Sequence, residues 1–136
     1  MTVNQITPHN AFDILKNQKN SILIDVRTLE EVNFVGAVDA SNFENRMLFL
    51  PWQILPQMQL NKNFSSELLA KLDPSQELIF ICRTGGRSNN SAELAIQIGF
   101  NKCHNIINGF EGDLNNQSQR GKINGWKASN LPWRQS

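Results

Sequence analysis

The chain has 136 residues, of which 40% are hydrophobic and 18% are charged, and its formal net charge is +1. This length fits one domain, residues 1–136, with a hydrophobic core that needs no disulfide or metal to hold it together. The near-zero charge provides no basic surface for nucleic acid or for an acidic membrane, so we expect neither as a partner.

Cysteine and histidine are sparse, with two of each at Cys82, Cys103, His9 and His104. Their spacing matches none of the familiar zinc patterns, so we expect no metal. The first ten residues are polar, unlike a signal peptide, and no apolar run approaches the roughly 18 residues of a membrane span. These features predict a cytoplasmic protein, in a reducing compartment where a thiol stays free for chemistry.

A helix and a buried strand are predicted first along the chain. Thr7 can cap a helix that starts at Pro8 and continues, with apolar residues at helical spacing, to about residue 19. Residues 21–26 then form an apolar run interrupted only by Asp25, which is the pattern of a strand covered on both faces. We expect this strand in the centre of a parallel sheet.

A second helix is predicted next, followed by a segment without a clear pattern. Thr28 and Glu31 form a capping-box sequence for a short helix that ends before Gly36. Residues 47–50 suit a strand. The remainder of residues 37–64 shows no clear period, and we assign no structure to it.

Strand and helix alternate again in the second half of the chain. The first predicted element is a helix capped by Ser65 or Ser66, with Leu68, Leu69 and Leu72 toward the core. It is followed by a strand over residues 78–81, a helix over 88–98 that ends before Gly99, and a strand over 103–107. This alternation predicts an α/β fold with a mainly parallel sheet. The tail carries several large apolar side chains, so it should pack back onto the domain.

The residue types that suit catalysis and anion binding are concentrated in one stretch, residues 82–88, with the sequence Cys-Arg-Thr-Gly-Gly-Arg-Ser. It forms the turn from a predicted strand to a predicted helix, which is where parallel α/β proteins bind ligands. Gly85 and Gly86 let successive backbone amides point around one centre, and the helix adds its own unpaired amides. This pattern predicts an anion-binding cradle with the sulfur of Cys82 at its rim.

Cys82 has the sequence surroundings of a nucleophile. Cysteines at helix N-termini beside cationic groups ionise more readily than free thiols, and Arg83 and Arg87 supply that charge. The same arginines would attract an anionic substrate. Packing alone does not explain two glycines and two arginines within five residues of a cysteine. Cys82 is therefore the candidate catalytic residue.

Other polar residues near the predicted sheet edge are interpreted as structural. Arg27 and Glu31 are four residues apart and are expected to pair, with Asp25 beside them, and so to fix the turn after the first strand. Cys103 begins its strand whereas Cys82 follows the end of another. Neighbouring parallel strands would hold the two thiols about 17 Å apart, against a limit of about 7 Å for a disulfide. We expect Cys103 in the core.

The chain resembles the single-domain rhodanese sulfurtransferases. The residues that carry the resemblance lie in the family's order: Leu23-Ile24-Asp25-Val26-Arg27 with Glu30-Glu31, Ile79 to Ser88, Asn108-Gly109-Phe110, Gly125-Trp126 and Leu131-Pro132-Trp133. The similarity spans most of the chain, and the cysteine loop is its most specific part. It implies a three-layer α/β/α fold around a central, mainly parallel sheet. Residues 33–38 depart from the family pattern, since they lack the histidine that many members carry there.

The resemblance also implies an activity, that of a thiosulfate sulfurtransferase. Rhodanese-type enzymes take a sulfane sulfur from a donor such as thiosulfate, hold it on a cysteine as a persulfide, and pass it to cyanide or a thiol. Carried over to this sequence, Cys82 is the persulfide carrier. The residues that would surround the transferred sulfur and bind the small anionic donor are Arg83, Thr84, Gly85, Gly86 and Arg87. No metal or organic cofactor is implied.

Two other functions stay open. In the first, the loop is a relay or binding module that holds a persulfide delivered by a partner protein, and free thiosulfate is a poor donor. In the second, the chain is a cysteine-based phosphatase. The related phosphatases have one more residue between the cysteine and the arginine, whereas four residues separate Cys82 from Arg87 here, and Ser88 takes the place of their arginine. The shorter loop favours a single sulfur over a phosphoryl group.

Overall fold

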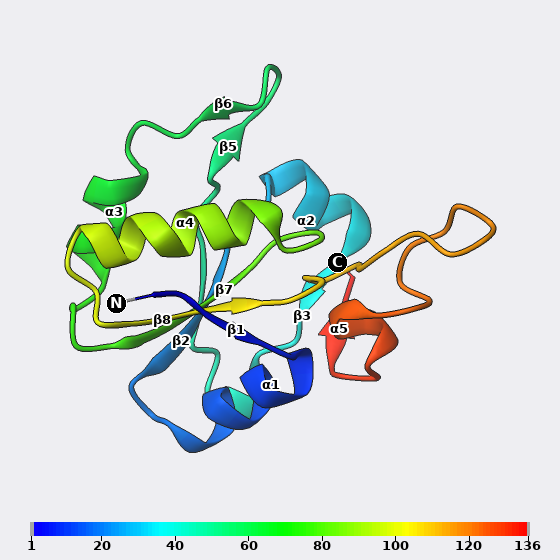
Figure 1. The fold of residues 1–136 in the computed structure, drawn as a ribbon, viewed down its shortest axis with the longest axis horizontal. Helices are drawn as coiled ribbons and strands as arrows, with labels where there is room; N and C mark the ends of the chain where they lie inside the picture. Colours follow the sequence, from blue (N-terminus) through cyan, green and yellow to red (C-terminus); the bar gives the residue numbers. More distant parts are fainter. Residues whose placement is uncertain (1, 136) are drawn as a thin grey trace.

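The computed structural model describes residues 2–135, and a five-stranded sheet runs through its centre. The strands are β1 (Asn4–Ile6), β2 (Ser21–Asp25), β4 (Met47–Phe49), β7 (Glu77–Ile81) and β8 (Lys102–Ile106). Their order across the sheet is β1-β8-β7-β2-β4, and every neighbouring pair is parallel (Figure 1). Parallel neighbours need crossover connections, as the predicted alternation of strand and helix requires.

Helices cover both faces of this sheet. They are α1 (Pro8–Asn17), α2 (Leu29–Val35), the 3-10 turn η1 (Ser41–Phe43), α3 (Phe64–Lys71), α4 (Gly86–Gln97) and α5 (Gly125–Ala128). Side chains of β7 alternate between the faces: Leu78 and Phe80 pack with α3 and α4, whereas Ile79 and Ile81 pack with α1, η1 and α5. The three-layer α/β fold is therefore confirmed.

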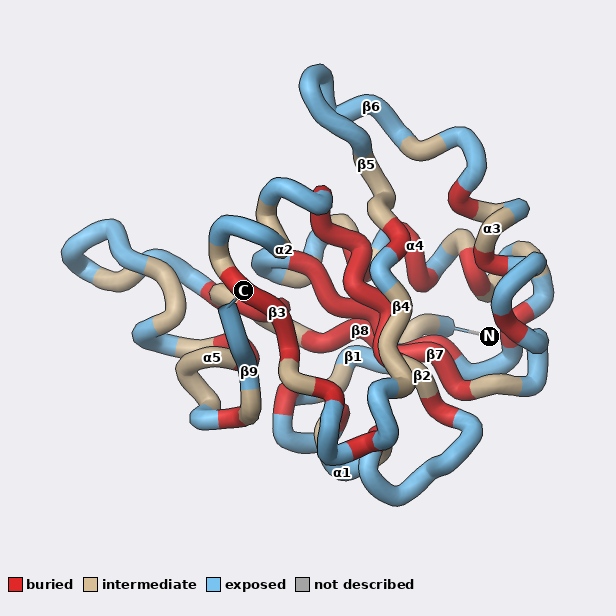
Figure 2. Tube along the Cα trace, turned by 180° about the vertical axis from the view of Figure 1, so that it is seen from behind, coloured by how far each residue is buried: buried red, intermediate tan, exposed pale blue. Residues whose placement is uncertain are grey.

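Four very short strands form two small antiparallel sheets outside the main one. The strand β3 (Ala37–Val38) pairs with β9 (Trp133–Arg134), and β5 (Gln53–Ile54) pairs with β6 (Gln59–Leu60). The first pair ties the C-terminal arm to the segment after α2. The β5–β6 hairpin projects from the body of the domain and is largely exposed, in contrast to the buried strands of the main sheet (Figures 1 and 2).

The predicted helices and strands are confirmed, with ends that move by one or two residues. Thr7 caps α1, and Thr28 and Glu31 make both hydrogen bonds of the predicted capping box. The strand β1 was not predicted, and neither were the elements between residues 37 and 64 apart from β4. Elements of two or three residues are too short to show a hydrophobic period.

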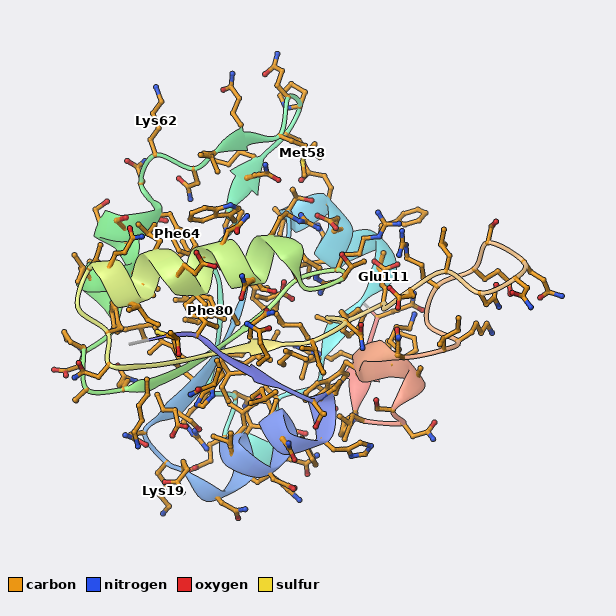
Figure 3. All side chains as sticks on the ribbon, in the orientation of Figure 1. Lys19, Met58, Lys62, Phe64, Phe80 and Glu111 are labelled. Carbon is orange, nitrogen blue, oxygen red and sulfur yellow. The ribbon has the colours of Figure 1, made fainter. Side chains whose placement is uncertain are left out.

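The start and the buried face of α3 differ from the prediction. Asn63 occupies the N-cap position, so neither Ser65 nor Ser66 caps the helix; the Ser66 hydroxyl donates instead to the Asn63 carbonyl at 3.0 Å. Leu69, predicted to face the core, is 48% exposed. Its place in the core is taken by Phe64, which belongs to the same buried cluster as Phe80 (both labelled in Figure 3). Leu68 and Leu72 are buried as predicted, so only Leu69 of the three leucines was assigned to the wrong face.

The described helices are short. The longest among residues 2–135 is α4, with 12 residues, and none of them combines the length and the apolar character needed to cross a membrane.

Candidate active site

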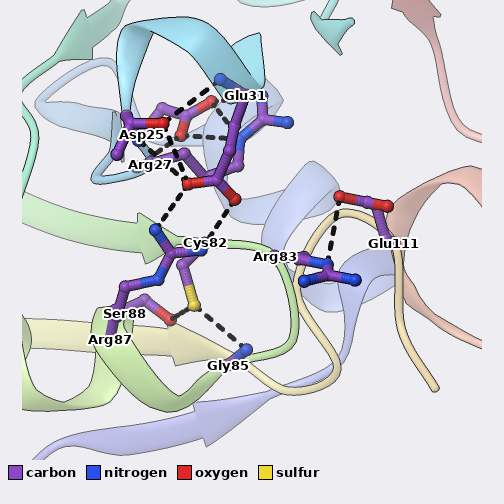
Figure 4. Close-up of polar contacts among 10 residues, drawn as sticks. Asp25, Arg27, Glu31, Cys82, Arg83, Gly85, Arg87, Ser88 and Glu111 are labelled. Atoms are coloured by element: carbon purple, nitrogen blue, oxygen red, sulfur yellow. Dashed lines mark hydrogen bonds and ion pairs between the residues drawn. The ribbon is translucent and has the colours of Figure 1, made fainter. Parts of the chain in front are cut away.

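Cys82 lies where β7 ends and α4 is about to begin, at the carboxyl edge of the parallel sheet. Its sulfur is 3.1 Å from the Gly85 backbone nitrogen, which donates to it, and 3.2 Å from the Ser88 hydroxyl (Figure 4). The residue is only 1% exposed. Donors that point at one sulfur stabilise negative charge on it, so the site suits a reactive thiolate approached by a small reagent.

The loop amide that reaches the sulfur depends on Gly85. This residue has a φ of +111°, a backbone conformation that residues with a Cβ rarely adopt. Gly86 does not share the requirement: it is the first residue of α4, and among the described residues a Cβ built on it would meet nothing within 4 Å. The prediction that both glycines need their conformational freedom is right for Gly85 and wrong for Gly86.

The other predicted substrate-binding residues surround Cys82 in the same loop. Arg83, Thr84 and Gly86 are exposed. The Arg83 guanidinium lies 3.6 Å from the carboxylate of Glu111 (Figure 4), a long and partly solvated ion pair. Such a pair is weakly held, so Arg83 can turn toward an incoming anion.

Arg87 is held firmly by Glu31. Its two terminal nitrogens donate to the two carboxylate oxygens at 2.6 and 2.8 Å. The hydrogen bond with Glu31 raises the pKa of Arg87, although burial acts in the opposite direction. The predicted pairing of Arg27 with Glu31 is therefore wrong, because α2 directs Glu31 toward the start of α4. Part of the positive charge that Arg87 brings to Cys82 is neutralised by this partner.

Arg27 instead forms a fully buried ion pair with Asp25. The shortest distance is 2.7 Å, and both side chains are 0% exposed. Arg27 also donates to the Gly36 carbonyl at 2.8 Å, and its guanidinium carbon lies 4.5 Å from the centre of the Phe110 ring. One side chain thus joins the end of β2 to the end of α2 and to the segment after β8. The predicted structural role of Asp25 and Arg27 is confirmed.

The segment after β8 supports the backbone of the cysteine loop. The Phe110 nitrogen donates to the Cys82 carbonyl at 2.8 Å, and the Glu111 nitrogen donates to the Arg83 carbonyl at 3.0 Å. Gly109 packs so closely that a Cβ built on it would lie 2.5 Å from the Cys82 oxygen and 2.7 Å from the Arg83 oxygen. Only a glycine therefore fits this position while the loop keeps its present course.

We expect Gly109→Ala to displace the cysteine loop. The added methyl group meets rigid backbone, so overpacking should lower the free energy of unfolding by about 1–3 kcal/mol and change the rate at which Cys82 reacts with iodoacetamide. Gly121→Ala is the matched control, since Gly121 also has a positive φ, +81°, but a Cβ there meets only Lys127 side-chain atoms at 3.9 Å. It should leave the alkylation rate of Cys82 unchanged. Equal reactivity of Cys82 in the Gly109 variant and the wild type would contradict this account.

The ion pair between Glu31 and Arg87 should make stability sensitive to acid. Partial burial acts to raise the pKa of Glu31, but hydrogen bonds from Arg87 and Thr28 and the charge of Arg87 outweigh it and lower the pKa from 4.5 to about 2. A lowered carboxyl pKa stabilises the folded state above pH 4.5, and this contribution is lost as the pH falls toward 2. With allowance for solvent screening it is worth about 1–2 kcal/mol.

Urea unfolding of the wild type and Glu31→Gln at pH 6 and pH 2.5 measures this contribution. The variant should be less stable at pH 6, and the difference should shrink at pH 2.5. Glu30→Gln, a neighbouring exposed carboxylate on α2, is the control and should track the wild type. A difference that is the same at both pH values would rule out the ion pair as its source.

Cys103 is a core residue, as predicted. It is buried, and burial raises the pKa of its thiol to about 12. In the sheet it lies opposite Leu78, four residues before Cys82, so about 13 Å of strand separates the two cysteine positions. Cys103 cannot reach Cys82 without unfolding of the sheet.

Two buried polar residues at the site were not predicted. Ser88 and Asn105 are almost completely inaccessible, and the Ser88 hydroxyl oxygen lies 2.5 Å from the Asn105 side-chain oxygen. The sequence signal for them was weak, because the strand β8 also carries a second buried polar residue, His104. Within residues 2–135, no cluster of three histidine, cysteine, aspartate or glutamate side chains is placed to hold a metal ion.

A parallel sheet with this order, covered on both faces and followed by a cysteine loop at its carboxyl edge, is a rhodanese-like fold. The solved rhodanese-like domain from Anabaena shares the fold with a TM-score of 0.66 at 14% identity, over 97% of this chain and 79% of that one. The family model of the STR4 middle domain matches residues 4–136, and the chain belongs to this family.

Several individual proteins are similar over nearly their whole length. The RP600 homolog of Rickettsia rickettsii is 42% identical over 135 residues, which cover 98% of each chain. The crystal structure of Rv0390 from M. tuberculosis matches with a TM-score of 0.91 at 35% identity, with all of both chains covered. The thiosulfate sulfurtransferase GlpE of Actinobacillus pleuropneumoniae is 23% identical over 131 residues, or 96% of this chain and 93% of the enzyme.

Proposed function

We propose that this protein is a sulfurtransferase that carries a sulfane sulfur on Cys82. The observation that carries the proposal is the position of the Cys82 sulfur just before α4, where the Gly85 amide donates to it and the Ser88 hydroxyl lies within hydrogen-bond distance. Both the attacking thiolate and the persulfide that it forms are anions that such donors stabilise. The similarity to GlpE supports the same class of reaction, with thiosulfate as the donor.

The proposed reaction has two displacement steps. The Cys82 thiolate attacks the outer sulfur of thiosulfate; a new S–S bond forms, the S–S bond of thiosulfate breaks, and sulfite leaves with the electron pair. The persulfide keeps one negative charge. Cyanide or a thiolate then attacks the terminal sulfur, the bond to Cys82 breaks, and the thiolate is regenerated. Atoms and charge balance in each step without a metal or an organic cofactor.

The loop residues have separate roles in this proposal. Arg83 attracts the dianionic donor, because its side chain is exposed and only loosely paired. The Gly85 amide donates to the Cys82 sulfur, and the other loop amides from Arg83 to Arg87 would surround the negative charge that develops on the transferred sulfur. Arg87 contributes a positive charge whose position is fixed by the ion pair with Glu31.

A partner-dependent persulfide relay is the second candidate. Its support is a set of exposed apolar side chains on α2 and the β5–β6 hairpin. On α2 these are Leu29 and Phe34, of which Phe34 is 86% exposed, and on the hairpin they are Ile54 and Leu60. Exposed apolar groups of this kind suit contact with another protein. In this case a partner protein, rather than thiosulfate, would load the almost completely buried sulfur of Cys82.

Mass spectrometry of the intact protein tests the proposal. Incubation with thiosulfate should add one sulfur, peptide mapping should locate it on Cys82, and cyanide should then release thiocyanate and restore the original mass. An adduct that forms only with a protein persulfide as donor would favour the relay. Failure of both donors, or phosphate release from an aryl phosphate, would overturn the proposal.

A further inference from the structure

We propose that Ser88 is a positioning residue that shifts its single hydroxyl hydrogen between Asn105 and Cys82, and thereby helps to set the pH at which Cys82 becomes reactive. The inference uses Cys82 as the reactive group of the proposed function, but it does not depend on which donor loads the sulfur. It rests on the buried hydrogen-bond network behind the cysteine loop.

The orientation of the Asn105 side chain is determined by its neighbours. Its amide nitrogen lies 3.2 Å from the Gly85 carbonyl oxygen and 2.8 Å from the side-chain oxygen of Gln5. A main-chain carbonyl can only accept a hydrogen bond, so the nitrogen of Asn105 must lie on that side. The Asn105 oxygen therefore faces Ser88 as an acceptor.

Ser88 then has two acceptors within reach and one hydrogen to donate. Its hydroxyl oxygen is 2.5 Å from the Asn105 oxygen and 3.2 Å from the Cys82 sulfur. A hydroxyl donates to one acceptor at a time but can accept from another group. While Cys82 is a thiol, the shorter contact assigns the Ser88 hydrogen to Asn105, and the Cys82 S–H can donate to the Ser88 oxygen.

Loss of the thiol proton to a solvent base reverses this arrangement. The thiolate has no hydrogen to donate and is the stronger acceptor, so the Ser88 hydroxyl turns to the sulfur. Asn105 then loses a donor inside the domain, where an unsatisfied acceptor is unfavourable. Ser88 accordingly favours the thiolate, whereas Asn105 opposes it by competing for the same hydrogen.

The charged groups around Cys82 are paired with one another and not with Ser88 or Asn105. The ion pairs are those of Arg87 of α4 with Glu31 of α2, Asp25 of β2 with the following Arg27, and Arg83 of the loop with Glu111 after β8. None of these ion pairs includes Ser88 or Asn105. Uncharged substitutions at the two positions therefore leave this electrostatic background in place.

The rate of Cys82 alkylation by iodoacetamide, followed by peptide mass spectrometry as a function of pH, tests the proposal. Ser88→Ala should move the midpoint of the profile up by about 1 pH unit, because the thiolate loses a charge-assisted donor. Asn105→Leu should move it down by about 0.5 to 1 unit. A purely structural role would not predict opposite directions for two residues in contact.

Two further variants make the test specific. In the double variant Ser88→Ala/Asn105→Leu, the downward shift of the pH midpoint should disappear, because no Ser88 hydroxyl remains for Asn105 to release. If the downward shift persisted, Asn105 would act on Cys82 through the Gly85 carbonyl instead. Ser91→Ala is the matched control, because the Ser91 hydroxyl is equally buried on α4 but donates to the Ser88 carbonyl at 2.9 Å. It should leave the midpoint unchanged.

Several results would overturn the proposal: an upward shift with Asn105→Leu, no shift with Ser88→Ala, or the same shift with Ser91→Ala. Circular dichroism identifies any variant that does not fold, and Asn105→Ala then replaces Asn105→Leu. Alkylation requires no sulfur donor, so a protein that fails to accept sulfur from thiosulfate can still pass or fail this test.

Discussion

Cys82→Ser should abolish sulfur transfer, with a fall in thiocyanate production of about 10⁴-fold or more. A serine oxygen is not ionised near neutral pH and cannot carry a sulfane sulfur as a persulfide. The substitution changes one atom at a position where the Gly85 amide and the Ser88 hydroxyl can still bond to an oxygen, so the fold should persist. Thiocyanate release and intact mass after thiosulfate treatment measure the loss.

Cys103→Ser is the control for that loss. Burial keeps the Cys103 thiol protonated, with a pKa of about 12, and the sheet holds it away from the loop. The variant should lose some stability but keep the one-sulfur adduct and its release by cyanide. If the adduct were to follow Cys103 instead, the assignment of the carrier to Cys82 would be wrong.

Asp25→Ala should have the largest effect on stability, a loss of about 3–5 kcal/mol in the free energy of unfolding. The variant leaves the Arg27 guanidinium charged, fully buried and without the Asp25 carboxylate. The hydrogen bond that the Arg27 backbone nitrogen donates to the same carboxylate is lost as well. Urea unfolding at neutral pH measures the change. The midpoint should fall strongly, and a domain of this size has little stability to spare.

The double variant Asp25→Leu/Arg27→Met separates the ion pair from simple packing. Replacing both charges with apolar groups of similar size removes the unpaired charge, so the double variant should be more stable than Asp25→Ala. If Asp25→Ala lost less than about 1 kcal/mol, the pair would not hold the end of β2 to the end of α2 as the contacts indicate.

Much of the fold could be predicted from local patterns. The apolar run of β7, the capping box of Thr28 and Glu31 and the Thr7 cap of α1 each act over a few neighbouring residues, so the sequence reveals them directly. The cysteine loop could also be predicted from local patterns. Its strand-to-helix turn and the positive φ of Gly85 follow from adjacent residues.

Partners that are distant in the sequence could not be predicted in this way. Arg87 pairs with Glu31, 56 positions away, and Ser88 meets Asn105 from the neighbouring strand, because the order β8-β7-β2 brings these residues to one edge of the sheet. The need for a glycine at position 109 arises from its contact with Cys82 across the same edge. Local propensity determined the loop that holds the candidate nucleophile Cys82, because a strand-to-helix turn depends on adjacent residues. Only the packed sheet decided which side chains pair with the loop's charges, support its backbone and complete its hydrogen bonds, because these partners are distant in the sequence.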